Sequence, residues 1–116
     1  MKPGEVYWTQ LPTGSGRTQG GRCPSIILQD DAVFPKRSPV VLSVPITSNL
    51  TAIDRFPATF RRDPTPENGL TYPSAVLVFQ TGAVDRRDSG DRIGQVDDAS
   101  LAEIFRLLDR LMNRTK

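Results

Sequence analysis

The chain has 116 residues, of which 37% are hydrophobic, and its 15 lysines and arginines against 13 acidic residues give a formal net charge of +2. This length has room for one modest core, so we expect a single domain over residues 1–116. The chain has no histidine and one cysteine, which excludes an intrachain disulfide, a plausible zinc site and the usual histidine-dependent hydrolases. Ten prolines and nine glycines predict a small β-rich fold with long loops.

The first two expected strands flank a long glycine-rich loop. Apolar and polar residues alternate in EVYWTQL, residues 5–11, as in a half-buried strand. The loop that follows carries Arg17 and Arg22 as fixed positive charges and ends at Pro24. SIILQ, residues 25–29, is a continuous apolar run, which predicts a strand covered on both faces. A polar loop on a rigid strand is a typical place for function.

More strands are expected further along the chain. Residues 40–48, VVLSVPITS, are rich in β-branched side chains, and we expect Pro45 at an edge, at a bulge or at the strand end. FPATFRR, residues 56–62, predicts a short strand, and SAVLVFQ, residues 74–80, predicts a central one. A last short strand is expected around residues 92–96.

The C-terminal segment predicts the only well-patterned helix of the chain, with Asp97 or Asp98 as its N-cap. Its apolar residues recur at spacings of three and four, so one side of the helix is expected to pack on the sheet. These residues are Leu101, Ile104, Phe105, Leu108 and Leu111 or Met112.

A cluster of small hydrogen-bonding side chains, Thr47, Ser48 and Asn49, ends the third strand. Such residues are well suited to start a turn, and taken alone the cluster favours this structural interpretation. The N-terminus lacks an apolar signal segment, and no run approaches the roughly 20 apolar residues of a membrane-spanning helix. We therefore expect a cytoplasmic protein without membrane contact.

Five stretches resemble, in this order, the MazF/PemK/Kid family of toxin endoribonucleases: GEVYW, TQGGRCP leading into SIILQDD, VPITS, SAVLVFQ and RIGQVDDASLAEI. They span nearly the whole chain. The resemblance implies an α+β, mainly β fold, a small SH3-like twisted β-barrel with a C-terminal helix, in a homodimer. It also implies the toxin of a bacterial toxin–antitoxin pair, which cuts single-stranded RNA without metal or cofactor and is neutralised by a cognate antitoxin.

The cleavage chemistry that the resemblance implies needs no histidine. The 2′-hydroxyl of the RNA attacks the adjacent phosphorus and leaves a 2′,3′-cyclic phosphate and a 5′-hydroxyl. The protein has to align the phosphate, offset the charge on its oxygens and assist proton transfer. An arginine clamp and a threonine hydroxyl suit these roles.

The family's site residues transfer to this sequence only in part. Thr47 matches the threonine of the PIT strand end, whereas Cys23 stands where the family arginine usually precedes the loop proline. Arg22 lies one residue earlier, and Gly82 stands in place of another family arginine. We predict Arg22 and Thr47 as the catalytic residues and Cys23 as a small buried side chain. The residues predicted to bind RNA are Arg17, Thr18, Gln19, Ser48, Asn49 and Gln80.

Two alternatives stay open beside the endoribonuclease. One is a module of the same fold that binds RNA or antitoxin but has lost catalysis. The replacements responsible would be Thr18, where many family members have glutamate, and Cys23 and Gly82. The other is a gyrase poison like CcdB, which shares the barrel. We rank it lower because that family uses an aromatic C-terminal tail, whereas this chain ends in LMNRTK. The candidates for stacking on bases are Trp8, Phe34, Phe56 and Tyr72. Trp8 is expected to be a core residue, and Phe34 is favoured because its polar loop is otherwise poor in core-forming residues.

Overall fold

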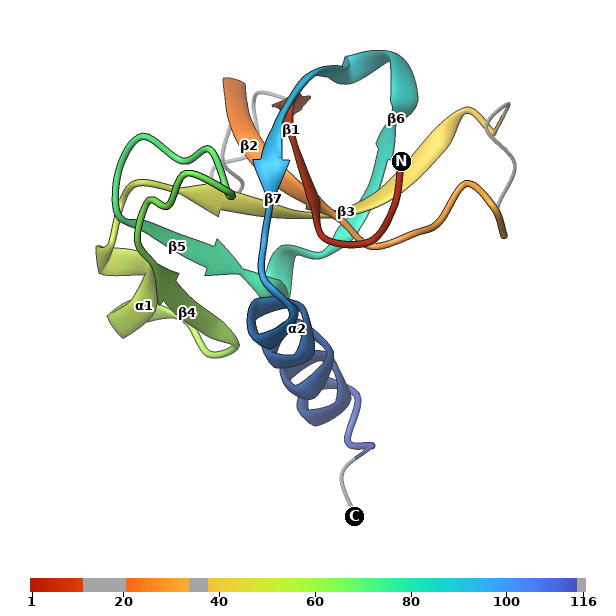
Figure 1. Cartoon of the computed structure of the whole chain (residues 1–116). Coiled ribbons are helices and arrows are strands. Elements are labelled where there is room, and N and C mark those ends of the chain that lie inside the picture. Colours follow the sequence, from red (N-terminus) through yellow and green to blue (C-terminus); the bar gives the residue numbers. More distant parts are fainter. Residues whose placement is uncertain (12–20, 34–37, 115–116) are drawn as a thin grey trace.

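The computed structural model describes residues 1–11, 21–33 and 38–114 (Figure 1). In the described chain the elements are β1 (Glu5–Leu11), β2 (Gly21–Ile27), β3 (Val40–Thr47), α1 (Thr51–Arg55), β4 (Thr59–Arg62), β5 (Ser74–Leu77), the 3₁₀ turn η1 (Val78–Gln80), β6 (Gly82–Asp85), the 3₁₀ turn η2 (Arg86–Asp88), β7 (Ser89–Gln95) and α2 (Asp98–Leu111). None of the described helices is long and apolar enough to cross a membrane.

The described strands form one antiparallel sheet in the order β4-β5-β3-β2-β1-β7, with β6 paired to β3. Figure 1 shows these twisted strands with α2 leaving them at the C-terminal end of the chain. The predicted fold class, mainly β with a C-terminal helix, is confirmed. The sheet is not closed, because β4 and β7 stand at the two ends of the paired path.

Strand β3 is the hub of this sheet, and Pro45 lies where its partner changes. Leu28 N donates to Leu42 O at 3.0 Å, so the alternation of an antiparallel ladder turns the nitrogen of Pro45 away from β2. Along that edge of β3, the pairing with β6 stops at Ser43 and the pairing with β5 starts at Ile46. Pro45 therefore sits between two partners in mid-strand, where its missing N–H costs no ladder bond.

The main core lies between the sheet and α2. It contains ten buried side chains. A large aliphatic side chain contributes about 1.5–3 kcal/mol to stability when it is fully removed from water. They are Val6, Ile26, Val44, Ile46, Leu70, Val76, Val78, Val96, Ile104 and Leu107.

The structure confirms the expected C-terminal helix, α2. The buried side of α2 is narrower than the stripe of apolar residues in its sequence. The side chain of Asp97 accepts a hydrogen bond from Ser100 N at 3.1 Å and so caps the helix, as expected. Ile104 is fully buried, whereas Phe105 and Met112 are 45% and 57% exposed. The helix thus meets the sheet along one edge of a wider apolar face.

Several element bounds differ from those expected. β2 begins at Gly21, four residues before the expected start at Ser25, because Arg22 and Pro24 pair with Gln10 and Trp8 of β1. Local glycine content predicted a loop there, and strand pairing overrides it. The strand expected at 56–62 is shortened to β4 and preceded by α1, and the one expected at 74–80 ends at Leu77 in a 3₁₀ turn. β6 was not expected.

Candidate active site

A pocket of about 190 Å³ lies where β2 and β3 meet the loop of residues 69–72. Its walls come from five parts of the chain that are far apart in sequence. Trp8 contributes from β1, Arg22 from β2, Thr47 from the end of β3, and Ile93 from β7. The two residues predicted to be catalytic therefore line one pocket.

The register of β1 and β2 places Arg22 beside Trp8. Gln10 is opposite Arg22 and Trp8 is opposite Pro24, so Arg22 and Trp8 are diagonal neighbours on one face. The guanidinium carbon of Arg22 lies 5.2 Å from the centre of the Trp8 ring, within the range of a cation–π contact. Trp8 is half-buried and lines the pocket, so the expectation that it is a core residue was wrong.

Arg22 carries a positive charge that no carboxylate of the described residues neutralises. The ion pairs of the described chain use other cations, among them Arg61, Arg86 and Arg92. Arg22 is exposed to solvent, with its guanidinium against the backbone of Gly90. An exposed, uncompensated guanidinium at the edge of a pocket is suited to bind an anion, and a phosphate in particular.

Thr47 presents a hydroxyl whose orientation is fixed by the backbone. The side chain is 5% exposed, and Thr47 Oγ1 accepts a hydrogen bond from Asn49 N at 3.1 Å. Within the described part of the chain the hydroxyl proton has no acceptor, so it is available to a ligand oxygen. The turn interpretation is correct as well, because Asn49 Oδ1 accepts hydrogen bonds from the N and Oγ1 of Thr51, at 3.2 and 2.7 Å, and so starts α1.

The other residues predicted to bind RNA have different positions. Ser48 lines the pocket beside Thr47, and Asn49 is occupied with the turn into α1. Gln80 ends the 3₁₀ turn after β5, whereas it is Ser74, at the start of β5, that lines the pocket. Arg17, Thr18, Gln19 and the stacking candidate Phe34 lie outside the described residues.

Cys23 is buried, as expected, with 3% of its surface exposed. Burial raises the pKa of the Cys23 thiol. The thiol is therefore protonated at neutral pH and is not a nucleophile.

Apart from the stacking candidate Tyr72, sequence analysis assigned no functional role to residues 63–73, the loop that contributes a second wall of the pocket. The buried side chain of Asn68 organises it. Its Oδ1 accepts from Thr65 N and Leu70 N, and its Nδ2 donates to Asp63 O, all at 3.0 Å. Gly69 has a φ of +70°, and a Cβ there would lie 1.9 Å from Ile93 O. The Asn-Gly pair was the available signal, since it is typical of such turns.

Comparison with known proteins identifies the family. The model of PemK-like, MazF-like toxins of type II toxin–antitoxin systems matches residues 2–112. The chain belongs to this family. Endoribonuclease MazF6 of Mycobacterium tuberculosis is 30% identical over 109 residues, which are 94% of this chain and 94% of MazF6.

Two solved structures show the same MazF fold. MazF of Deinococcus radiodurans matches with a TM-score of 0.78 at 22% identity, over 97% of this chain and 96% of its own. An endoribonuclease in complex with its cognate antitoxin, from Mycobacterial species, matches with a TM-score of 0.69 at 19% identity, over 100% and 96% of the two chains. These likenesses support the MazF-type fold of the described strands and helices.

Proposed function

We propose that this protein is an endoribonuclease toxin that cleaves single-stranded RNA at preferred sequences without a metal ion. One observation carries the proposal: the uncompensated guanidinium of Arg22 and the oriented hydroxyl of Thr47 line one pocket. The relatives that share the family are named endoribonucleases, which agrees with this chemistry.

In the proposed reaction the protein binds and orients the phosphate, and the RNA supplies the nucleophile. Arg22 holds two phosphoryl oxygens and offsets the negative charge that grows on them as the 2′-hydroxyl attacks. The Thr47 hydroxyl donates its proton in a hydrogen bond to one of these oxygens, while Asn49 N keeps the hydroxyl in place. The bond from the 2′-oxygen to phosphorus forms as the 2′-oxygen gives its proton to solvent water. The bond from phosphorus to the 5′-oxygen breaks, and that oxygen takes up a proton from solvent. The products are a 2′,3′-cyclic phosphate and a 5′-hydroxyl.

The partners that we propose are single-stranded RNA, a cognate antitoxin and a second copy of the chain. Arg17, Thr18, Gln19, Ser48, Asn49 and Gln80 stay predicted RNA-binding residues. A homodimer is supported by the large apolar side chains that α2 leaves at the surface, Phe105, Leu111 and Met112, each at least 45% exposed. An antitoxin partner is supported by the matching structure of a family toxin in complex with its cognate antitoxin.

The first experiment incubates the purified protein with a long single-stranded RNA in EDTA and maps the cut sites and end groups. Thr47→Val removes the hydroxyl at nearly constant volume, and Thr47→Ser keeps it. We expect discrete cuts with cyclic phosphate ends from the wild type, reduced cutting by Thr47→Ser, and none by Thr47→Val. A requirement for a divalent metal would contradict the metal-independent reaction. Intact RNA, from folded protein free of antitoxin, would overturn the enzyme and favour the binding module.

A further inference from the structure

The walls of the pocket differ in chemistry. Arg22 and Thr47 provide polar groups for an anion. Leu70 and Ile93 line the same pocket with apolar groups, and Ile46 lies buried in the core beneath it. A free phosphate would gain nothing from the apolar lining. A ligand that uses both kinds of lining carries a negative charge next to a flat apolar group, as a nucleotide does.

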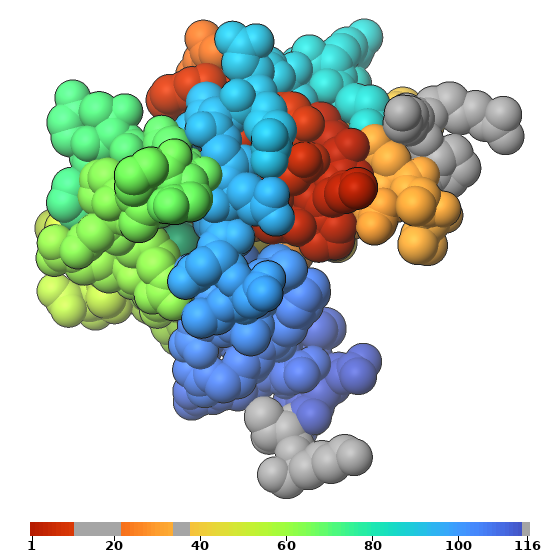
Figure 2. Space-filling view, in the orientation of Figure 1, coloured from red at the N-terminus to blue at the C-terminus, as the bar shows by residue number. Residues whose placement is uncertain are grey.

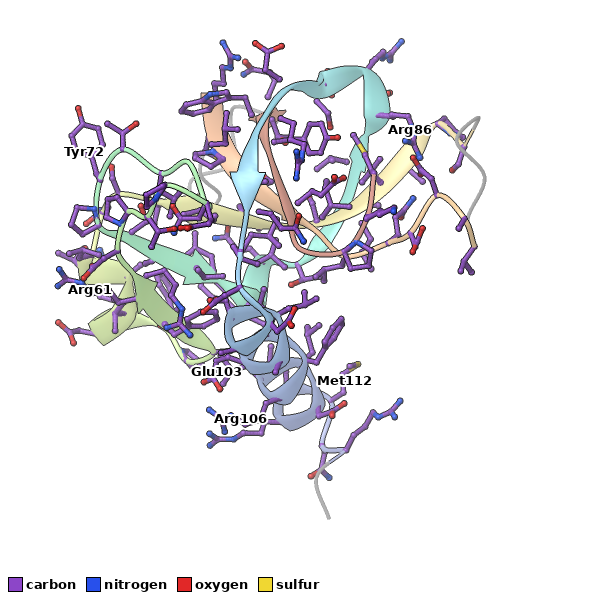
Figure 3. All side chains as sticks on the ribbon, viewed as in Figure 1. Arg61, Tyr72, Arg86, Glu103, Arg106 and Met112 are labelled. Atoms are coloured by element: carbon purple, nitrogen blue, oxygen red, sulfur yellow. The ribbon has the colours of Figure 1, made fainter. Side chains whose placement is uncertain are left out.

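Two aromatic side chains stand at this pocket. Trp8 lies under the guanidinium of Arg22, and Tyr72 belongs to the loop on the other side. Figure 3 shows Tyr72 projecting from this loop into solvent, and the residue is 64% exposed. An exposed tyrosine ring beside a pocket is able to pack on a ligand while its hydroxyl stays in water. In recognition of single-stranded RNA, unstacked bases pack on aromatic rings and on arginine planes.

We propose that the pocket is a nucleobase subsite, which takes the base of the nucleotide whose phosphate is bound by Arg22 and Thr47, with Tyr72 packed against that base. This inference rests on the proposed function, since it assigns the substrate contact that gives the cleavage its sequence preference. The pocket volume of about 190 Å³ corresponds to roughly six waters, which suits one ring system.

The loop that carries Tyr72 is held in place before any ligand arrives. Gln95 N donates to Glu67 O at 2.7 Å, which joins the loop to the end of β7. Ser74 Oγ donates to the carbonyl of Tyr72, also at 2.7 Å. Figure 2 shows the loop and β7 in contact along one face of the molecule. Because this wall is preformed, it loses little conformational entropy when a ligand binds. The free energy of its contacts with a base is then available for affinity and for discrimination between bases.

The test uses a short RNA that spans one mapped cut site and a set of the same RNAs with a single abasic residue at each position around the cut. We expect one abasic position to lower the wild-type kcat/KM about tenfold. Tyr72→Ala should lower kcat/KM on the intact RNA by a similar factor and remove the penalty at that one position. Tyr72→Phe, which keeps the ring, should behave as the wild type. If Tyr72→Ala cleaves RNA and shows every abasic penalty unchanged, the subsite is wrong while the proposed function stands.

RNA binding, measured by fluorescence, tests the nucleobase subsite even if the wild type cleaves no RNA. Trp8 is the only tryptophan of the chain and lines the pocket, so its fluorescence reports occupancy. A single-stranded 2′-O-methyl RNA of mixed sequence should quench Trp8, and an abasic strand of equal length should not. The quenching should weaken in Tyr72→Ala and persist in Tyr72→Phe. Equal quenching by both strands, or none by either, would overturn the nucleobase subsite.

Discussion

The two ends of strand β3 hold arginines in opposite situations. At the start of β3, Arg86 donates to Ser38 O at 3.0 Å and pairs with Asp31 at 3.0 Å, while the amino terminus binds the same carboxylate at 2.6 Å. At the far end, beside Thr47, Arg22 has no carboxylate partner among the described residues and rests on an aromatic ring. Figure 3 shows Arg86 on the side of the molecule opposite to Tyr72 of the pocket.

The same type of side chain therefore has two roles, a structural one for Arg86 and a functional one for Arg22. Asp31 is 9% exposed, and the charges around it are satisfied within the chain, so this end contributes to stability and has little to offer a ligand. The pocket end has a cation and a hydroxyl with unused hydrogen-bonding capacity. Variants at the pocket end should therefore change activity, and variants at the Arg86 end should change stability.

The largest effect is expected from Arg22→Ala. Loss of one charged donor to the phosphate should lower kcat/KM for RNA cleavage by about 100-fold or more. The unfolding free energy should fall by no more than about 1 kcal/mol, because the side chain is exposed and loses only its contacts with Trp8 and the Gly90 backbone. Cleavage assays and urea unfolding of the same preparation measure both quantities. If Arg22→Ala cleaved RNA with the wild-type kcat/KM, Arg22 would not be a catalytic residue.

Gly69→Ala should damage the loop of the pocket and the fold together. A Cβ would meet Ile93 O at 1.9 Å on a backbone with a φ of +70°, so the loop has to move off β7. We expect a loss of about 3 kcal/mol in the unfolding free energy and a weaker kcat/KM at a temperature where the variant is folded. Gly82→Ala is the matched control, because a Cβ there approaches another atom no closer than 3.8 Å. Equal stability of the two variants would contradict the close packing.

Asp31→Asn tests the other end of β3. The hydrogen bonds from the amino terminus and Arg86 hold the pKa of Asp31 below its usual value. A depressed carboxyl pKa contributes stability above the unfolded-state pKa of about 3.9, and this stability is lost as the pH falls through the lower folded-state value. Asp31→Asn should therefore cost about 2 kcal/mol at pH 7.

The same substitution should become harmless in acid. Its cost relative to the wild type should shrink below about pH 4, which thermal unfolding between pH 3 and pH 7 measures. At pH 7 the folded fraction of Asp31→Asn should cleave RNA as the wild type does. Loss of RNA cleavage by folded Asp31→Asn would contradict the separation of β3 into a structural end and a functional end.

The smallest effect is expected from Arg87→Ala. This variant also removes one guanidinium group and so serves as a matched control for Arg22→Ala. The Arg87 side chain is 85% exposed and pairs with Asp85 on the surface at 3.0 Å. Such pairs contribute about 0.5 kcal/mol or less, so both stability and cleavage should stay within error of the wild type. A marked loss of RNA cleavage would extend the RNA-binding surface to η2.

Much of the chain could be predicted from local sequence. β-branched and alternating runs indicated β1, β3 and β5, and the Asp97 cap with its apolar spacing indicated α2, because these signals act over a few residues. The resemblance of short motifs pointed to the family that the comparison identifies. Thr47 was found as a site candidate in this way.

Other parts depend on contacts between distant residues. Gly21 and Arg22 join β2 because β1 offers them a partner, although glycines predicted a loop. The loop around Asn68 becomes a pocket wall because Gly94 of β7 admits its backbone, where a Cβ would meet Glu67 O at 2.4 Å.

The sequence by itself determined the composition of the site, with an arginine and a hydroxyl and no imidazole, and it determined strand β3, which carries Thr47. Only the tertiary structure decided that Arg22 lies over Trp8, that Thr47 lines the same pocket, and that Tyr72 stands across from them. The physical reason is that side-chain chemistry and local backbone preference are properties of short segments. Whether a charge is neutralised, as for Arg86, or left free for a ligand, as for Arg22, depends on which distant segments the sheet brings beside it.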